Sequence, residues 1–165
     1  METIINRSPI VASVIEITPK FNLFNIVAAI GAIVMIVGVF LSWVDLSGAV
    51  SQSVMGWDIS TQSAYSGTTY SYVPMTVLAC GIVFLALAII SMIGMTTKWD
   101  MVLSLIGVAV SVAALILVIL FNGDIGSSFG TATVDAVTGM GVWVSLVGSV
   151  VAAACGAMEA FKDLA

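Results

Sequence analysis

The acidic side chains are the residues of this chain best suited to chemistry. Hard cations bind several oxygen ligands, so a calcium site is one hypothesis for them. Asn122–Ser128 (NGDIGSS) begins like part of a calcium-binding loop, but it lacks the alternating acids and closing glutamate that make that motif specific. Solvated loop acids are the favoured interpretation, and no metal site is expected. The acids concerned are Asp45, Asp58, Asp124 and Asp135.

Other chemical motifs are missing from the sequence. The chain has no histidine, which removes the commonest general base and metal ligand. Cys80 and Cys155 lie in apolar runs without CxxC spacing, so both are expected to be small buried hydrophobes. No phosphate-binding glycine loop, Ser/His/Asp set, HExxH motif or basic patch occurs. The sequence therefore predicts a protein that is not an enzyme, has no cofactor and does not bind nucleic acid.

The composition places the chain in the membrane. Of its 165 residues, 61% are hydrophobic and only 8% are charged, against roughly 25% charged in a soluble domain. Four apolar segments each approach the roughly 20 residues that a membrane-crossing helix needs. We therefore predict an all-α membrane protein, a bundle of four transmembrane helices. The predicted spans are 24–43, 73–95, 101–121 and 139–160.

The charged residues lie outside the central parts of these spans. Because an ionisable residue in mid-membrane usually marks a transport pathway, a transporter is disfavoured. Glu159 is at the end of the last span, where water or lipid headgroups are expected to reach it. All four basic residues, Arg7, Lys20, Lys98 and Lys162, fall on one side of the predicted spans. The positive-inside rule then predicts a multi-pass plasma-membrane protein with both termini in the cytoplasm and outer loops at 44–72 and 122–138.

Residues 1–22 are predicted to be a cytoplasmic segment that precedes one transmembrane domain, 23–165. Ser8 as N-cap, Pro9 in the first turn and Pro19 as a stop are typical of a short helix, which would lie in the inner membrane interface. A disordered tail is the equal alternative, and a cleaved signal sequence is a minor one.

The first outer loop carries strand and contact signals. Residues 49–54 (AVSQSV) and 57–62 (WDISTQ) alternate apolar and polar side chains, and turns are plausible at Met55-Gly56 and Ser66-Gly67. We expect a small extracellular antiparallel β-sheet within this loop, resting on the helix ends. Because interfaces are enriched in aromatic residues, the expected contact residues are Trp57, Tyr65, Tyr70 and Tyr72.

Small residues recur at spacings of three and four in the apolar segments. Such stripes let helices approach closely in lipid, where they associate through packing. Their expected use is to close the bundle of one subunit, and a surplus stripe could join subunits. The predicted packing residues are Gly31, Gly38, Gly107, Ser111, Gly141, Ser145, Gly148, Ala152 and Gly156.

The tryptophans fall near predicted boundaries or in a loop. Trp43, Trp99 and Trp143 fit an aromatic belt that fixes helix depth. Trp57 follows Gly56 in the predicted sheet, where packing is the favoured role. With the loop lengths, this arrangement of Trp43 and Gly56-Trp57 resembles the first-loop signature of the claudin-like four-span membrane proteins. The paired loop cysteines of that family are absent, and so is its leucine between glycine and tryptophan. The resemblance implies lateral self-association and extracellular contacts.

Three functional hypotheses follow. The first is a non-enzymatic structural or interaction protein that self-associates in the lipid bilayer and makes contacts through its outer loops. Its partners would then be membrane lipid and further copies of the chain, or other membrane protein subunits. The second is an accessory subunit of a larger membrane enzyme or transport complex. The third is an oligomeric pore lined by Ser and Thr, with an acidic outer mouth that favours cations.

Overall fold

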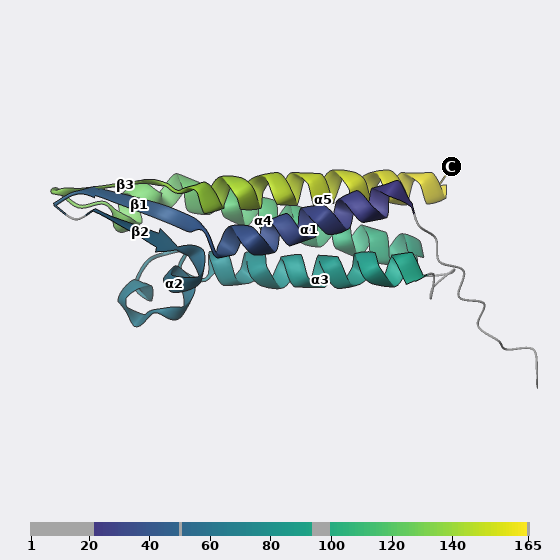
Figure 1. The fold of residues 1–165 in the computed structure, drawn as a ribbon, viewed down its shortest axis with the longest axis horizontal. Coiled ribbons are helices and arrows are strands. Elements are labelled where there is room, and N and C mark those ends of the chain that lie inside the picture. Colours follow the sequence, from purple (N-terminus) through teal and green to yellow (C-terminus); the bar gives the residue numbers. More distant parts are fainter. Residues whose placement is uncertain (1–21, 50, 94–99, 165) are drawn as a thin grey trace, which may run out of the picture.

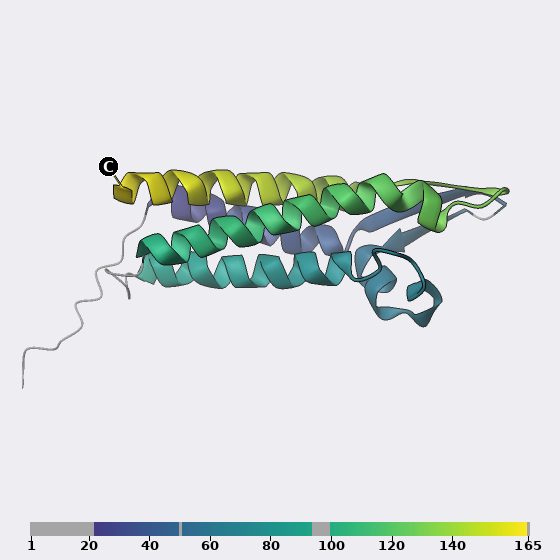
Figure 2. The ribbon, with the colours of Figure 1, turned by 180° about the vertical axis from the view of Figure 1, so that it is seen from behind.

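Four long helices lie side by side, and a small sheet stands at one end of them (Figures 1 and 2). The computed structural model describes residues 22–49, 51–93 and 100–164. The predicted N-terminal helix, the turn between the second and third spans and Trp99 lie outside the described residues. The long helices are α1 (Leu23–Val39), α3 (Val73–Ile93), α4 (Asp100–Phe129) and α5 (Met140–Leu164).

Each long helix packs against two others, in the cyclic order α1, α5, α4, α3. Among the described residues, three helices are long and apolar enough to cross a membrane, namely α3, α4 and α5, and α1 is a shorter apolar helix of 17 residues. Their outward positions carry large apolar side chains such as Ile30, Ile82 and Ile119. The prediction of apolar helices is therefore confirmed, with corrections to their ends.

The first predicted helix is too long and the third is too short. Helix α1 ends at Val39, and Trp43 belongs to a strand instead of the last turn of a span. Helix α4 continues through residues 122–129, which were predicted to be loop. The cause is an apolar spacing of four, because Phe121 and Ile125 are buried and Phe129 packs against the same core. The NGDIGSS stretch is therefore helical.

The sheet has three antiparallel strands in the order β2, β1, β3. They are β1 (Ser42–Gly48), β2 (Gln52–Met55) and β3 (Val134–Thr138). In the central strand, Val44 pairs with Val54 on one side and with Thr138 on the other. An antiparallel sheet is confirmed, but its prediction as a first-loop structure is wrong, because β3 comes from the segment between α4 and α5.

The WDISTQ segment is helical instead of extended. It forms most of α2 (Gly56–Thr61), followed by a short 3₁₀ turn, η2 (Ser63–Tyr65). Gly56 and Ile59 are both buried, which is a helical spacing of three, and the Thr61 hydroxyl donates to the Trp57 carbonyl at 2.8 Å. The alternation of polar and apolar residues was thus a misleading signal. We call β1–β3, α2, η2 and the residues that join them the head.

Helices α1 and α5 approach each other along a line of small residues, which we call the glycine seam: Gly31, Gly38, Gly141 and Gly148. A Cβ on Gly148 would lie 2.7 Å from the backbone nitrogen of Met35 and 2.8 Å from the carbonyl oxygen of Gly31. A Cβ on Gly31 would in turn lie 2.9 Å from the backbone nitrogen of Ala152. Backbone faces backbone here, so a side chain would have to force the helices apart.

Trp43 closes the sheet end of this seam. Its indole is fully buried, its Nε1 donates to the Gly38 carbonyl at 2.9 Å, and its ring meets the Phe121 ring edge-on with centroids 5.0 Å apart. A Cβ on Gly141 would lie 2.6 Å from Trp43 Cδ1, and a Cβ on Gly56 would lie 2.7 Å from its Nε1. The predicted belt position of Trp43 is therefore wrong, because the residue is a core anchor between the head and the helices.

The glycine seam predicts a position-dependent cost of adding one methyl group. We expect Gly148→Ala to lower the free energy of unfolding by about 1–3 kcal/mol through overpacking. Gly123→Ala in α4 is the matched control, since a Cβ there has no atom within 4 Å, and it should be neutral or slightly stabilising. Thermal unfolding in detergent, followed by circular dichroism, measures both. Equal melting temperatures for the two variants would contradict close α1–α5 contact.

The Trp43 anchor predicts a similar contrast between two tryptophans. We expect Trp43→Phe to cost about 2 kcal/mol, because it loses the bond to Gly38 and leaves a void. Trp143→Phe should change stability by less than about 0.5 kcal/mol, because Trp143 is 53% exposed. The same unfolding assay tests the pair. A larger loss for Trp143→Phe would reverse the assignment of core and surface.

Candidate functional site

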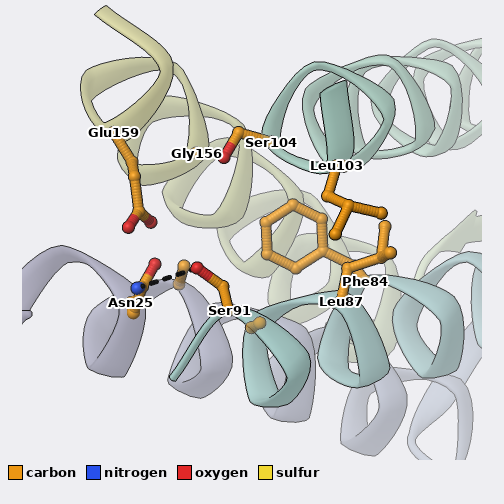
Figure 3. A pocket seen from close by; sticks show the side chains of 11 residues that line it. Asn25, Phe84, Leu87, Ser91, Leu103, Ser104, Gly156 and Glu159 are labelled. Atoms are coloured by element: carbon orange, nitrogen blue, oxygen red, sulfur yellow. Dashed lines mark hydrogen bonds between the residues drawn. The ribbon is translucent and has the colours of Figure 1, made fainter. Parts of the chain in front are cut away.

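A cavity of about 30 Å³ lies among the four long helices, at the end opposite the head (Figure 3). Every long helix contributes to its wall. Its polar groups come from Asn25 of α1, Ser91 of α3, Ser104 of α4 and Glu159 of α5. These positions lie within about two turns of the helix ends. The rest of the wall is apolar or small, so this is a polar site in otherwise apolar surroundings.

Asn25 is the most deeply buried polar side chain of the site. It is 3% exposed, and its Nδ2 donates to the Ser91 hydroxyl oxygen at 3.2 Å, which joins α1 to α3. An amide without a partner in an apolar interior costs several kcal/mol, so this bond explains how the bundle tolerates Asn25. Glu159 is half-buried, and its side chain points from α5 toward Asn25 (Figure 3).

The Phe84 ring bounds the cavity on the side nearer the head. Two glycines make room for it, since a Cβ on Gly107 would lie 3.0 Å from Phe84 Cε2 and a Cβ on Gly156 would lie 3.5 Å from Phe84 Cζ. Two of the predicted packing glycines therefore shape this cavity, by seating an aromatic ring between α4 and α5.

This site was not predicted from the sequence. Glu159 was expected where water or headgroups reach it, and Asn25, Ser91 and Ser104 were not singled out. A usable signal was present, because each of these polar residues lies close to the same end of its apolar segment once the antiparallel topology is applied. Sequence spacing alone does not show that the four side chains face one another.

The predicted packing residues are all buried inside this one chain. Six of them line the contact between α1 and α5: Gly31, Gly38, Gly141, Ser145, Gly148 and Ala152. Ser111 donates to the Gly107 carbonyl of its own helix at 2.9 Å. Ser145 Oγ is buried and has no hydrogen-bond partner among the described residues. The nine residues thus fill the interior of one bundle.

The predicted contact residues divide into two groups. Trp57 and Tyr72 are 40% and 53% exposed, and the Trp57 ring stacks on Phe40 with centroids 5.8 Å apart. Tyr65 and Tyr70 are half-buried, and the Tyr65 ring lies 6.1 Å from that of Phe129. Tyr65 therefore helps to fix the head to the end of α4, whereas Trp57 and Tyr72 remain accessible.

The acids of the predicted outer loops lie on four different elements, β1, α2, α4 and β3. Within the described residues, no group of three or more His, Cys, Asp or Glu is placed to hold a metal ion. The Asp124 carboxylate accepts hydrogen bonds from Ser127 and Ser128 of its own helix. Asp45 lies in the central strand, where its Oδ1 is buried without a hydrogen-bond partner among the described residues. No family model, curated protein or solved structure matches this chain.

The Asn25–Ser91 bond predicts a measurable coupling between α1 and α3. In a double-mutant cycle of Asn25→Ala and Ser91→Ala, we expect a coupling free energy of about 0.6 kcal/mol, the average for interhelical hydrogen bonds in a membrane protein, and at most about 1.7 kcal/mol. The control cycle pairs Asn25→Ala with Ser111→Ala, whose hydroxyl bonds within its own helix, and should give additive effects. Unfolding in detergent measures both cycles. Equal coupling in the two would show that the bond does not form.

Proposed function

We propose that this chain is a four-span, non-enzymatic membrane protein whose function is to make contacts, with its head as the contact surface. The proposal takes α1 as the fourth span beside the three longer helices. Its 17 residues rise about 26 Å, slightly less than a hydrocarbon core of roughly 30 Å. The placement of the basic residues supports cytoplasmic termini and a head outside the plasma membrane.

The observation that carries the proposal is the exposure of large apolar side chains on the head. Met55 is 50% exposed and Val137 is 55% exposed, in addition to Trp57 and Tyr72. The head stands at the end of the helices (Figure 1), where lipid tails would not cover all of these side chains. Exposed apolar and aromatic groups outside the bilayer are typical of protein contact surfaces.

The head is held rigidly enough to present these groups. Its central strand continues from α1 after a short turn, the Gly56 amide donates to the Leu41 carbonyl at 3.2 Å, and the Gly139 amide donates to the Trp43 carbonyl at 2.9 Å. The Ser60 hydroxyl also donates to the Ser71 carbonyl at 2.6 Å. Because little ordering remains to be done on association, such a surface loses less entropy when it binds.

We propose further copies of the same chain as the first partner, in keeping with the topological resemblance to claudin-like proteins. The accessory-subunit hypothesis is the second candidate, and the acidity of the head favours it. Residues 42–72 and 130–138 contain three acids and no lysine or arginine, which suits a partner with a basic surface. The pore hypothesis gains no support, because the stripe serines Ser111 and Ser145 lie inside one bundle.

Native mass spectrometry of the chain, extracted from its own membranes in mild detergent, tests this function. We expect species at multiples of 17.0 kDa, and we expect Trp57→Ala to shift them toward the single chain. Trp143→Ala is the matched control, because it removes another exposed tryptophan, from a helix instead of the head. Assemblies with heavier foreign chains that are lost in Trp57→Ala would favour the accessory subunit. A single chain in both variants and in the wild type would contradict the proposal.

A further inference from the structure

A hollow of about 260 Å³ lies on the side of the head, between α2, η2 and the residues just before α3. This part of the head stands beside the start of α3 (Figures 1 and 2). The wall contains the buried Ile59 and the exposed Tyr72, and its other members are neutral and polar. These are Ser60, Thr61, Gln62, Ser63, Ser66 and Ser71. Because no residue of the wall is charged, the hollow suits neither phosphate or carboxylate groups nor metal ions.

The wall keeps several polar groups available for a ligand. Three of its hydroxyls already donate to backbone carbonyls at 2.6 to 2.8 Å, namely those of Ser60, Thr61 and Ser66. The Gln62 amide and the hydroxyls of Ser63 and Ser71 make no side-chain hydrogen bond within residues 51–93 or elsewhere among the described residues. An amide supplies donors and an acceptor, and a hydroxyl supplies one donor and accepts as well. The hollow therefore offers both kinds of hydrogen bond without charge.

Hydrogen bonds and ring contacts within the chain hold the hollow in shape. Besides donating to the Ser71 carbonyl, the Ser60 hydroxyl accepts from the Met75 amide at 3.2 Å, which ties α2 to the first turn of α3. The Tyr72 ring lies against the Tyr70 ring, with centroids 6.3 Å apart. Because the wall is ordered before a ligand arrives, little conformational entropy is lost on binding.

A sugar ring matches this wall in chemistry and in size. A hexose is uncharged, its hydroxyls both donate and accept, and one face of its ring consists of C–H groups. The hydroxyls complement Gln62, Ser63 and Ser71, and the C–H face packs against an aromatic ring such as that of Tyr72. The volume is below the roughly 300–1,000 Å³ of pockets for drug-sized ligands, so the hollow takes one sugar ring instead of an oligosaccharide.

We propose that this hollow binds one neutral hexose ring, through hydrogen bonds to Gln62, Ser63 and Ser71 and packing on Tyr72. Ser71 and Tyr72 directly precede Val73, the first residue of α3, so the proposed span along α3 places the hollow at the bilayer surface. A glycolipid headgroup and a soluble saccharide both present such a ring at that height. This function goes beyond the contacts proposed for the head, because it needs no second protein chain.

Saturation-transfer NMR on the full chain in phosphatidylcholine nanodiscs tests the site, with the methyl glycosides of glucose, galactose and mannose as probes. We expect saturable binding of at least one glycoside, with a Kd on the order of 1 mM, as the few atoms of one sugar ring allow. Tyr72→Ala should weaken binding about tenfold, whereas Tyr72→Phe, which keeps the ring, should retain most of it. Gln62→Ala should weaken binding several-fold, because it removes hydrogen bonds to the sugar.

The matched controls are Gln52→Ala, which removes an exposed amide elsewhere in the head, and Trp143→Ala, which removes an exposed aromatic ring from a helix. Both should bind like the wild type. No transfer to any of the three glycosides would overturn the proposal, as would transfer that Tyr72→Ala and Gln62→Ala retain in full.

The source of the sugar is determined by competition. Nanodiscs are prepared with a lipid that carries the bound hexose as its headgroup. Loss of the transfer signal of the free glycoside in these nanodiscs would support a lipid headgroup as the ligand, and an unchanged signal would support a soluble saccharide.

Discussion

The close contact of α1 and α5 is the constraint on which the rest of the structure depends. At the glycine seam the backbones of the two helices approach each other to a distance that only small residues allow. This contact sets the positions of α3 and α4, which close the ring of helices on the other side. It also brings the end of α1 next to the start of α5. As a result β1, which follows α1, lies beside β3, which precedes α5.

The Gly38 carbonyl links the seam to the head. It accepts the Trp43 indole N–H at 2.9 Å and the Leu41 amide at 3.2 Å, just where α1 gives way to β1. Trp43 then fills the space that Gly56 and Gly141 leave open. Gly56 therefore makes room for the Trp43 ring, whereas the Trp57 ring is exposed beside Phe40. The arrangement of Trp43 and Gly56-Trp57 thus combines a core residue with a surface residue.

Much of the fold could be predicted from the sequence, because apolar runs of about 20 residues have few alternatives to a buried or membrane-crossing helix. The starts of α3 and α5 fall within one residue of their predicted positions. The head could be predicted only in part, since Val134–Thr138 is short and its pairing with β1 depends on the meeting of distant segments. The polar cavity was missed for the same reason: Asn25 and Glu159 are far apart in sequence, and only the packed helices bring their side chains to one space.

Because β3 lies far from β1 and β2 in the sequence, the sheet also limits the order in which the molecule can fold. β1 and β2 form a local hairpin early in the chain, but β1 gains its second neighbour only when β3 follows α4. During synthesis, the hairpin therefore exposes one unpaired edge until α4 and β3 have emerged. The head is therefore completed only after α4 has formed and just before α5 follows, which couples the folding of the head to that of the last two long helices.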